Sequence, residues 1–226
     1  MAASSQARPL FRGGLLFSLC LAVAASAAPV MDFTPPSPGS YRLERIQAAG
    51  DGAVLDSAGK RRRLAEFTRG RVTLLAFMYA SCADPNGCPY ALSVMHQLKN
   101  ELEKIPSTRG RAGFVSLSFD PVRDTPAMLA LYGAQHADGR HVAWDFLTTR
   151  SRRELLPILK DWGQDVGIEI DRATGKALGT YSHVLKVFLV DRRGAVREIY
   201  TTDYLLPAMV LNDIKTLLIE DGVVLR

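Results

Sequence analysis

Cysteine is scarce in this chain, with three residues among 226. Cys20 lies in an uncharged N-terminal segment, which leaves Cys82 and Cys88 as the only cysteines of the main body. A framework of several disulfides is therefore excluded, and no zinc-finger spacing accompanies the pair. A body of this size does not need one short-range disulfide in order to fold, so reactivity explains the pair better. A passive structural disulfide is the alternative.

Several other signatures are also missing. The main body has no apolar run long enough to span a membrane, no glycine-rich phosphate-binding loop and no serine nucleophile elbow. Hydrophobic residues nevertheless make up 47% of the chain, which is too many for a disordered protein and enough for a real core. The length suits one domain preceded by a short extra segment.

Positive charge is not concentrated enough in any part of the chain to indicate nucleic acid or anionic lipid as a partner. The formal net charge is +5, and two of the positive residues, Arg8 and Arg12, lie near the N-terminus. The run Arg61-Arg62-Arg63 is the one basic cluster. It suits nucleic acid or anionic lipid in principle, but a solvated loop is the simpler interpretation. Since no nucleic-acid-binding motif accompanies the run, we expect no nucleic-acid partner.

The N-terminus has the pattern of an export signal. Arg8 and Arg12 precede an uncharged, leucine-rich stretch, and Ala25-Ser26-Ala27 fits the small-x-small pattern of a cleavage site. We therefore predict a signal peptide over residues 1–27, with an uncleaved membrane anchor as the alternative. A proline-rich linker over 28–50 and a domain over 51–226 should follow. The protein is expected to be exported, either periplasmic or membrane-anchored and facing the periplasm.

Hydrophobic periodicity predicts alternating strands and helices. The segment 52–67 resembles a β-hairpin, and the apolar run 72–79 suits a strand that is covered on both faces. Strand–helix alternation of this kind predicts an α/β fold with a central mixed sheet, helices on both of its faces and an N-terminal β-hairpin. The remaining predicted strands are 113–119, 143–147, 184–190 and 196–200, and the predicted helices are 89–105, a helix with Pro126 in its first turn, 151–162 and 205–219.

The cysteine pair lies between a buried strand and a helix. Pro89 supplies the preset φ of a first helical turn, so Cys88 should lie at or next to the N-cap. Free backbone N–H groups and the helix dipole at that point favour a thiolate, which is both a metal ligand and the nucleophile of disulfide exchange. Cys82 and Cys88 are therefore the candidate redox pair.

Three sequence blocks resemble one known family. FMYASCADPNGCP at 77–89, SFDPVRDTP at 118–126 and YSHVLKVFLVDRRG at 181–194 are similar to the blocks of the SCO/SenC family of thioredoxin-like copper-binding proteins. The resemblance covers about residues 50–226 and implies a thioredoxin-like fold. It also implies that Cys82, Cys88 and His183 are copper ligands. Members of the family deliver copper to the binuclear copper site of cytochrome c oxidase, or reduce its cysteines.

The spacing of the cysteines departs from the family pattern. Five residues separate Cys82 from Cys88, where the family usually has three. The longer loop changes how the sulfurs approach a metal and relaxes the geometry required of a disulfide. Two thiolates and an imidazole still form a ligand set that suits copper, and zinc would also accept it.

The other polar candidates have simpler interpretations. His96 is expected to face solvent from the helix, and His136 and His141 to flank a loop without binding metal. By the resemblance, Asp120 and Asp124 support the site from the end of the second buried strand. Ordinary turn and helix-cap chemistry also explains these two aspartates.

Two functions follow from these residues. The first is a copper metallochaperone whose partner is the copper-binding subunit of cytochrome c oxidase. The second is an extracytoplasmic thiol–disulfide oxidoreductase that acts on this or another cysteine-containing exported protein, without a metal role. A thiol peroxidase is a weaker third hypothesis, since only the shared fold favours it. His183 separates the first two functions, because disulfide exchange needs only the cysteines.

Overall fold

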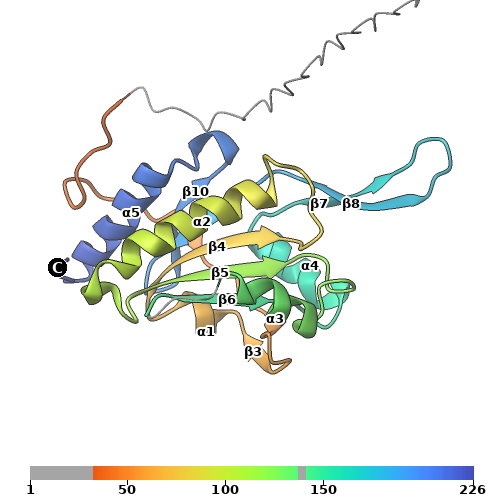
Figure 1. The fold of residues 1–226 in the computed structure, drawn as a ribbon, viewed down its shortest axis with the longest axis horizontal. Helices are drawn as coiled ribbons and strands as arrows, with labels where there is room; N and C mark the ends of the chain where they lie inside the picture. The colour runs from red at the N-terminus through yellow and green to blue at the C-terminus, as the bar shows by residue number, and fades with distance from the viewer. Residues whose placement is uncertain (1–32, 137–140) are drawn as a thin grey trace, which may run out of the picture. The chain divides into compact units, whose positions relative to one another are not determined.

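A six-stranded mixed sheet lies at the centre of the structure, which is a computed structural model that describes residues 33–136 and 141–226. The strand order is β1-β10-β9-β4-β5-β6 (Figure 1). Strands β4, β5 and β6 are parallel, while β9 is antiparallel to β4, and β10 continues the antiparallel edge. The six strands are β1 (Gln47–Ala48), β4 (Val72–Met78), β5 (Ala112–Ser118), β6 (Ala143–Leu147), β9 (Val187–Val190) and β10 (Ala195–Tyr200).

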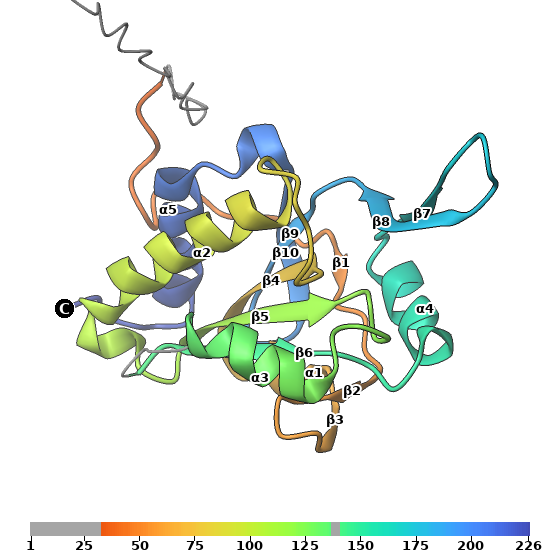
Figure 2. The ribbon, with the colours of Figure 1, turned by 45° about the vertical axis from the view of Figure 1, so that its right-hand side comes forward.

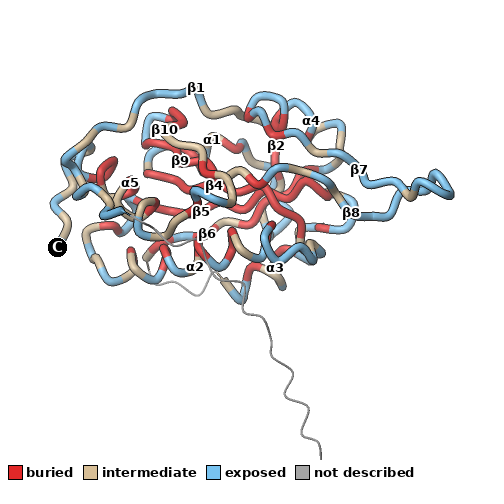
Figure 3. The backbone as a smooth tube through the Cα atoms, turned by 90° about the horizontal axis from the view of Figure 1, so that it is seen from above, coloured by how far each residue is buried: buried red, intermediate tan, exposed pale blue. Residues whose placement is uncertain are grey.

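The middle strands are covered on both faces. Every residue of β4 and β5 is buried, which is why these segments read as continuous apolar runs rather than alternating ones. Figure 3 shows this burial as a red centre surrounded by tan and pale blue segments. The predicted central sheet is confirmed, with strand boundaries within one residue for both β4 and β5.

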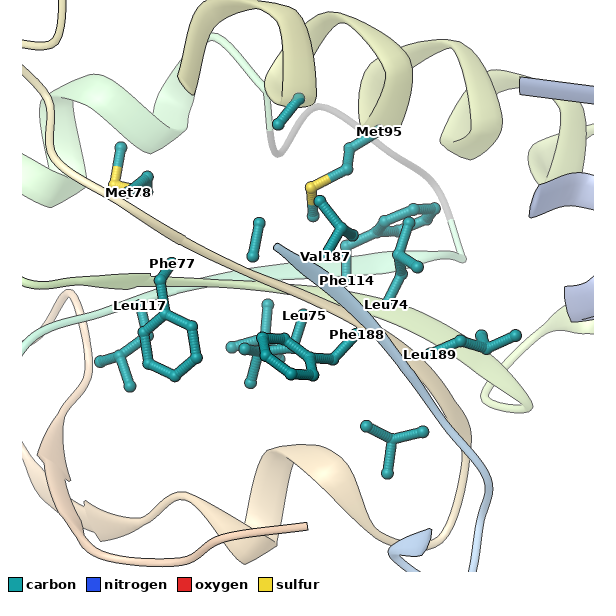
Figure 4. Packing of buried hydrophobic residues seen from close by; sticks show 14 of the residues in the cluster. Leu74, Leu75, Phe77, Met78, Met95, Phe114, Leu117, Val187, Phe188 and Leu189 are labelled. Carbon is teal, nitrogen blue, oxygen red and sulfur yellow. The ribbon is translucent and has the colours of Figure 1, made fainter. Parts of the chain in front are cut away.

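Helices lie on both faces of the sheet, as predicted. On one face Met95 of α2 packs over Leu74 and Phe114, as Figure 4 shows. On the opposite face Phe77 meets Trp162, which directly follows α4, at a ring-centroid distance of 5.9 Å. The helices are α1 (Ala65–Thr68), α2 (Cys88–Glu103), α3 (Pro126–Ala134), α4 (Arg152–Asp161) and α5 (Pro207–Glu220), and two short 3₁₀ helices cover Pro106–Thr108 and Thr202–Tyr204.

The predicted N-terminal hairpin is present as β2 (Ala53–Leu55) and β3 (Arg61–Arg63), which form their own two-stranded sheet. The arginine run is therefore a strand and not the solvated loop that we predicted. Its side chains are engaged within the domain. The ion pairs join Arg61 to Glu154, Arg62 to Glu66 and Arg63 to Asp51.

The domain begins earlier than the predicted residue 51. The described residues from Phe33 onward form one compact unit, and strand β1 lies inside the segment that we predicted as a linker. Gln47 pairs with Val196, and the backbone N–H of Gly39 donates to Thr216 of α5 at 3.0 Å. Backbone hydrogen bonds thus attach the proline-rich stretch before residue 51 to the domain, although its composition alone predicts a linker. The predicted signal peptide over 1–27, with Cys20, lies outside the described residues. Within the described ranges, no helix has the length and apolar character needed to cross a membrane.

A second hairpin was not predicted. Strands β7 (Val166–Ile170) and β8 (Ala177–His183) pair antiparallel and extend away from the sheet (Figure 2). Nearly all of their residues are exposed or half-buried on both faces, so the alternation that marks a half-buried strand is missing. His183 was expected to begin the next sheet strand, but it ends β8, and β9 begins only at Val187.

Candidate functional site

The cysteine loop connects the end of β4 to the start of α2. A tight turn opens it, in which the N–H of Cys82 donates to the carbonyl of Tyr79 at 3.1 Å. A second turn closes it, in which the carbonyl of Asp84 accepts from the N–H of Gly87 at 3.0 Å. Gly87 is the N-cap of α2, and Cys88 is the first helical residue, as predicted. One turn thus precedes Cys82, and the other folds the last four of the five residues between the cysteines.

The two thiols are brought together by this loop. Both cysteines are free, and the neighbouring Cys82 thiol is one of the groups that raise the pKa of Cys88, so the two side chains lie close together. Their exposure differs, because Cys88 is 1% exposed while Cys82 lies half-buried at the surface. The predicted pair is therefore adjacent in space, with one sulfur inside the protein and one at its edge.

Burial dominates the acidity of the inner thiol. It raises the pKa of Cys88 to about 12, although a hydrogen bond from the backbone of Tyr79 acts in the opposite direction. The expected helix-stabilised thiolate is therefore not the resting form of Cys88, because desolvation outweighs the helix N-terminus. A metal ion or an oxidant must displace a proton from this sulfur.

His183 reaches the same region from the β7–β8 hairpin. Its ring lies 4.8 Å from the ring of Phe119, centroid to centroid. Burial lowers the pKa of His183, so the imidazole is neutral at pH 7. The neutral form is the one that ligates metals.

An open pocket of about 430 Å³ separates the imidazole from the thiols. Cys82 and His183 both line it, together with Asp84, Glu169 and Tyr181. In the part of the chain that the structure describes, no three His, Cys, Asp or Glu side chains are close enough to hold a metal ion together. The structure thus places the two thiols close together and His183 on the same pocket as Cys82, without joining all three.

An aromatic wall backs His183, and the sequence analysis did not single it out. Tyr79, Phe119 and Tyr181 lie with their ring centroids 5.2 to 5.4 Å apart. Arg123 covers this cluster, with its guanidinium 5.6 Å from the centre of the Tyr181 ring. The only signal in the sequence was that Tyr79 and Phe119 directly follow two buried strands, where the carboxyl ends of parallel strands meet.

A family model described as SCO1/SenC matches residues 44–219. The chain belongs to the SCO1/SenC family. A search of curated proteins found no match.

Solved structures of this family have the same fold. Sco1 from Thermus thermophilus, solved without metal, has a TM-score of 0.63 at 23% identity, over 79% of this chain and 98% of that chain. ScoI from Bradyrhizobium japonicum, solved with copper bound, has a TM-score of 0.60 at 21% identity, over 74% and 98%. BsSco, described as a member of the Sco family of cytochrome c oxidase assembly proteins with a disulfide switch, has a TM-score of 0.57 at 22% identity, over 78% and 98%. The predicted thioredoxin-like fold is confirmed.

Asp124 anchors the start of the cysteine loop in this SCO1/SenC chain. Its carboxylate accepts from the N–H of Ala80 at 2.9 Å and from the hydroxyl of Ser118 at 2.6 Å. Burial raises the pKa of Asp124 despite these two bonds. The helix-cap role falls to Thr125, whose side chain accepts from the N–H of Met128.

Asp120 has a different partner and fixes the hairpin. Its carboxylate is 2% exposed and forms an ion pair with Arg123. The same arginine donates to the carbonyl of Gly179 in β8. The two aspartates thus support the two sides of the pocket, Asp124 through the loop and Asp120 through Arg123.

The remaining histidines lie outside this pocket. His141 forms an ion pair with Glu103, with 3.0 Å between Nδ1 and Oε2. His96 does not simply face solvent, as we expected, because its ring lies 6.2 Å from the ring of His136. These residues are therefore not part of the thiol site.

Proposed function

We propose that this chain is a copper-binding metallochaperone of the SCO/SenC type, with Cys82, Cys88 and His183 as its ligands. The observation that carries the proposal is a pair of neighbouring thiols, one of which, Cys82, lines the same pocket as the neutral imidazole of His183. Two sulfurs and one imidazole nitrogen are the ligand types that copper prefers. ScoI from Bradyrhizobium japonicum, with copper bound, supports the same cargo here.

The residues fit copper once two local changes have occurred. The thiols must lose their protons, which the positive charge of a metal ion favours even where burial opposes it. His183 must approach the sulfurs, and it lies on the hairpin, where few buried contacts restrain the backbone. Copper is the cargo of this reaction, so an incomplete ligand set in its absence suits uptake and release.

The recipient that the family membership favours is the copper-binding subunit of cytochrome c oxidase. BsSco is described as belonging to a family of cytochrome c oxidase assembly proteins, which supports this choice. We infer that transfer takes place outside the cytoplasm, by a periplasmic or membrane-anchored protein. The signal-like N-terminus supports this location.

A thiol–disulfide oxidoreductase without a metal role is the second candidate. The closeness of the two free thiols favours it, because two neighbouring cysteine side chains can be joined by a disulfide with little motion of the backbone. In that reaction Cys82 and Cys88 form one S–S bond, and the partner's disulfide takes up the two electrons and two protons. The disulfide switch of BsSco is consistent with the same chemistry.

Copper titration of the reduced protein tests the first function. We expect one copper ion per chain by metal analysis, with thiolate-to-copper charge-transfer absorption. The Cys82→Ser/Cys88→Ser variant is the matched control and should lose both signals. Copper content no higher than in this control would reject the metallochaperone.

Replacing the histidine separates the two functions. His183→Ala should weaken copper binding by at least tenfold in competition with a chelator, because one ligand of three is lost. Disulfide formation, measured as a mass loss of two hydrogens after mild oxidation, should stay nearly unchanged, since exchange needs only the thiols. His141→Ala is the control, because His141 pairs with Glu103 away from the pocket. Unchanged copper affinity in His183→Ala would remove His183 from the site.

A further inference from the structure

A second pocket lies between helix α2 and the end of α3. It is open, has a volume of about 450 Å³ and shares no lining residue with the thiol site. Residues of α2 and of the segment around α3 line it, among them Pro89, Leu92, His96, Tyr132 and His136. The fold thus joins two histidines that are far apart in the sequence.

The two imidazole rings both line this pocket and lie edge to face. Their centroids are 6.2 Å apart, and the ring planes are inclined at 75°. Two imidazoles that share one metal ion, each with a metal–nitrogen bond of about 2 Å, place their centroids roughly 5 to 6 Å apart. The observed separation lies just above this range, so a small approach of the two rings brings it to the value for a shared ion.

Packing fixes one of the two rings. His136 stacks against Phe146 and lies 5.3 Å from Trp144 and 5.4 Å from Tyr132, centroid to centroid. The backbone N–H of His136 also donates to the carbonyl of Gly133 at 2.9 Å. Three aromatic neighbours therefore hold this imidazole toward the pocket before any ligand arrives.

The second ring has a polar atom without a partner. Nδ1 of His96 is buried, and among the described residues no group hydrogen-bonds to it. Buried polar atoms in folded proteins are nearly always paired, so this nitrogen is free to accept a partner that the described residues do not supply. His141 also has a buried ring nitrogen without a partner, but no second histidine ring faces it within the described ranges. His141 is for that reason a matched control.

We propose that His96 and His136 together bind a divalent transition-metal ion of the copper–zinc class. Imidazole nitrogen suits copper and zinc better than calcium or magnesium, and copper(II) binds such ligands most tightly of the divalent series. Solvent in the open pocket would complete the coordination. The site adjoins Pro89, next to Cys88, but needs neither the thiols nor His183.

Removing the thiol site tests this proposal independently of the proposed function. The full chain with Cys20→Ser, Cys82→Ser, Cys88→Ser and His183→Ala has no thiol. It also lacks the histidine of the thiol pocket but keeps His96 and His136. Titrated with Cu²⁺ and separately with Zn²⁺, it should bind one ion. For Cu²⁺, electron paramagnetic resonance should show coupling to imidazole nitrogen. Adding His96→Ala should weaken binding at least tenfold, whereas adding His141→Ala should not.

Equal binding with and without His96→Ala, or no binding at all, would overturn the proposal. His136→Gln should repeat the effect of His96→Ala while it retains more of the aromatic packing than alanine would. If the thiol-free chain does not fold, the same histidine variants are compared in the His183→Ala chain after Cys82 and Cys88 have been oxidised to a disulfide. A metal-dependent rise in melting temperature that disappears with His96→Ala provides a second readout.

Discussion

The two sides of the thiol pocket are built in opposite ways. Cys82 and Cys88 are attached to β4 and α2, whose inward residues are among the most buried in the described chain. His183 ends a hairpin whose apolar residues Ile170 and Leu178 are each 57% exposed. One side is thus fixed by the core, while the other has few buried contacts of its own. Under the proposed function this difference favours uptake and release of copper, because only His183 would have to move.

The largest difference between the cysteine side and the hairpin side should appear in the free energy of unfolding. Phe77→Ala removes a buried ring that contacts Trp162 and Phe188, and we expect a loss of about 3 to 5 kcal/mol in the free energy of unfolding. Ile170→Ala on the hairpin should cost no more than about 0.5 kcal/mol. Urea denaturation of both variants measures the difference. Similar losses would show that the hairpin belongs to the cooperative core.

Asp124→Ala should cost less but affect the thiols directly. It leaves the N–H of Ala80 and the hydroxyl of Ser118 without their acceptor, so we expect a loss of about 1 to 3 kcal/mol. The cysteine loop loses its anchor, and alkylation of Cys88 in the native protein should become faster. Asp171→Ala is the control, because Asp171 accepts backbone N–H groups only within the tip of the hairpin. An unchanged alkylation rate in Asp124→Ala would contradict an anchoring role.

Arg123 joins the two sides, so its removal should loosen the histidine side. We expect Arg123→Ala to cost about 1 to 2 kcal/mol, since the buried carboxylate of Asp120 loses its partner. The hairpin loses the bond to Gly179 and the contact with Tyr181, so hydrogen exchange in β8 should accelerate. Exchange in β4 should not change. Arg172→Ala, at an exposed position near the hairpin tip, is the control.

The smallest expected effect is a pH dependence of the folding stability, which comes from Cys88 on the cysteine side of the pocket. The pKa of Cys88 is raised from 9.0 to about 12, so between these values the folded chain holds a proton that the unfolded chain has released. Stability from this group is therefore complete below pH 9 and is lost as the pH rises toward 12. Urea midpoints at pH 8 and pH 10.5 should differ less in Cys88→Ser than in the natural chain. An equal difference in both proteins would assign the dependence to the buried tyrosines instead.

The cysteine side of the pocket, formed by β4, the cysteine loop and α2, was also the side that the sequence predicted well. The apolar run of β4 and the proline after Cys88 located the strand, the loop and the helix start, because burial and φ restriction are recorded in local residue types. What local pattern did not reveal was the protonation of Cys88. That depends on the whole surroundings of the sulfur, which no single segment encodes.

The histidine side was predicted only through the family resemblance. The hairpin has no buried face, so no periodic pattern announced β7 and β8, and His183 was placed at the start of a strand rather than at the end of one. The contact between His96 and His136 was missed for a related reason. It depends on the packing of α3 beside α2, and spacing along the chain carries no trace of it.

The unequal exposure of the two sulfurs has a consequence for the order of bond-making. A partner protein can touch Cys82 at the surface but not Cys88, which is 1% exposed. Any mixed disulfide with a partner therefore forms on Cys82, and Cys88 attacks that bond from inside and releases the partner. Cys88→Ser should accordingly leave partners covalently attached, whereas Cys82→Ser should capture none. The buried thiol thus limits how long a covalent complex lasts.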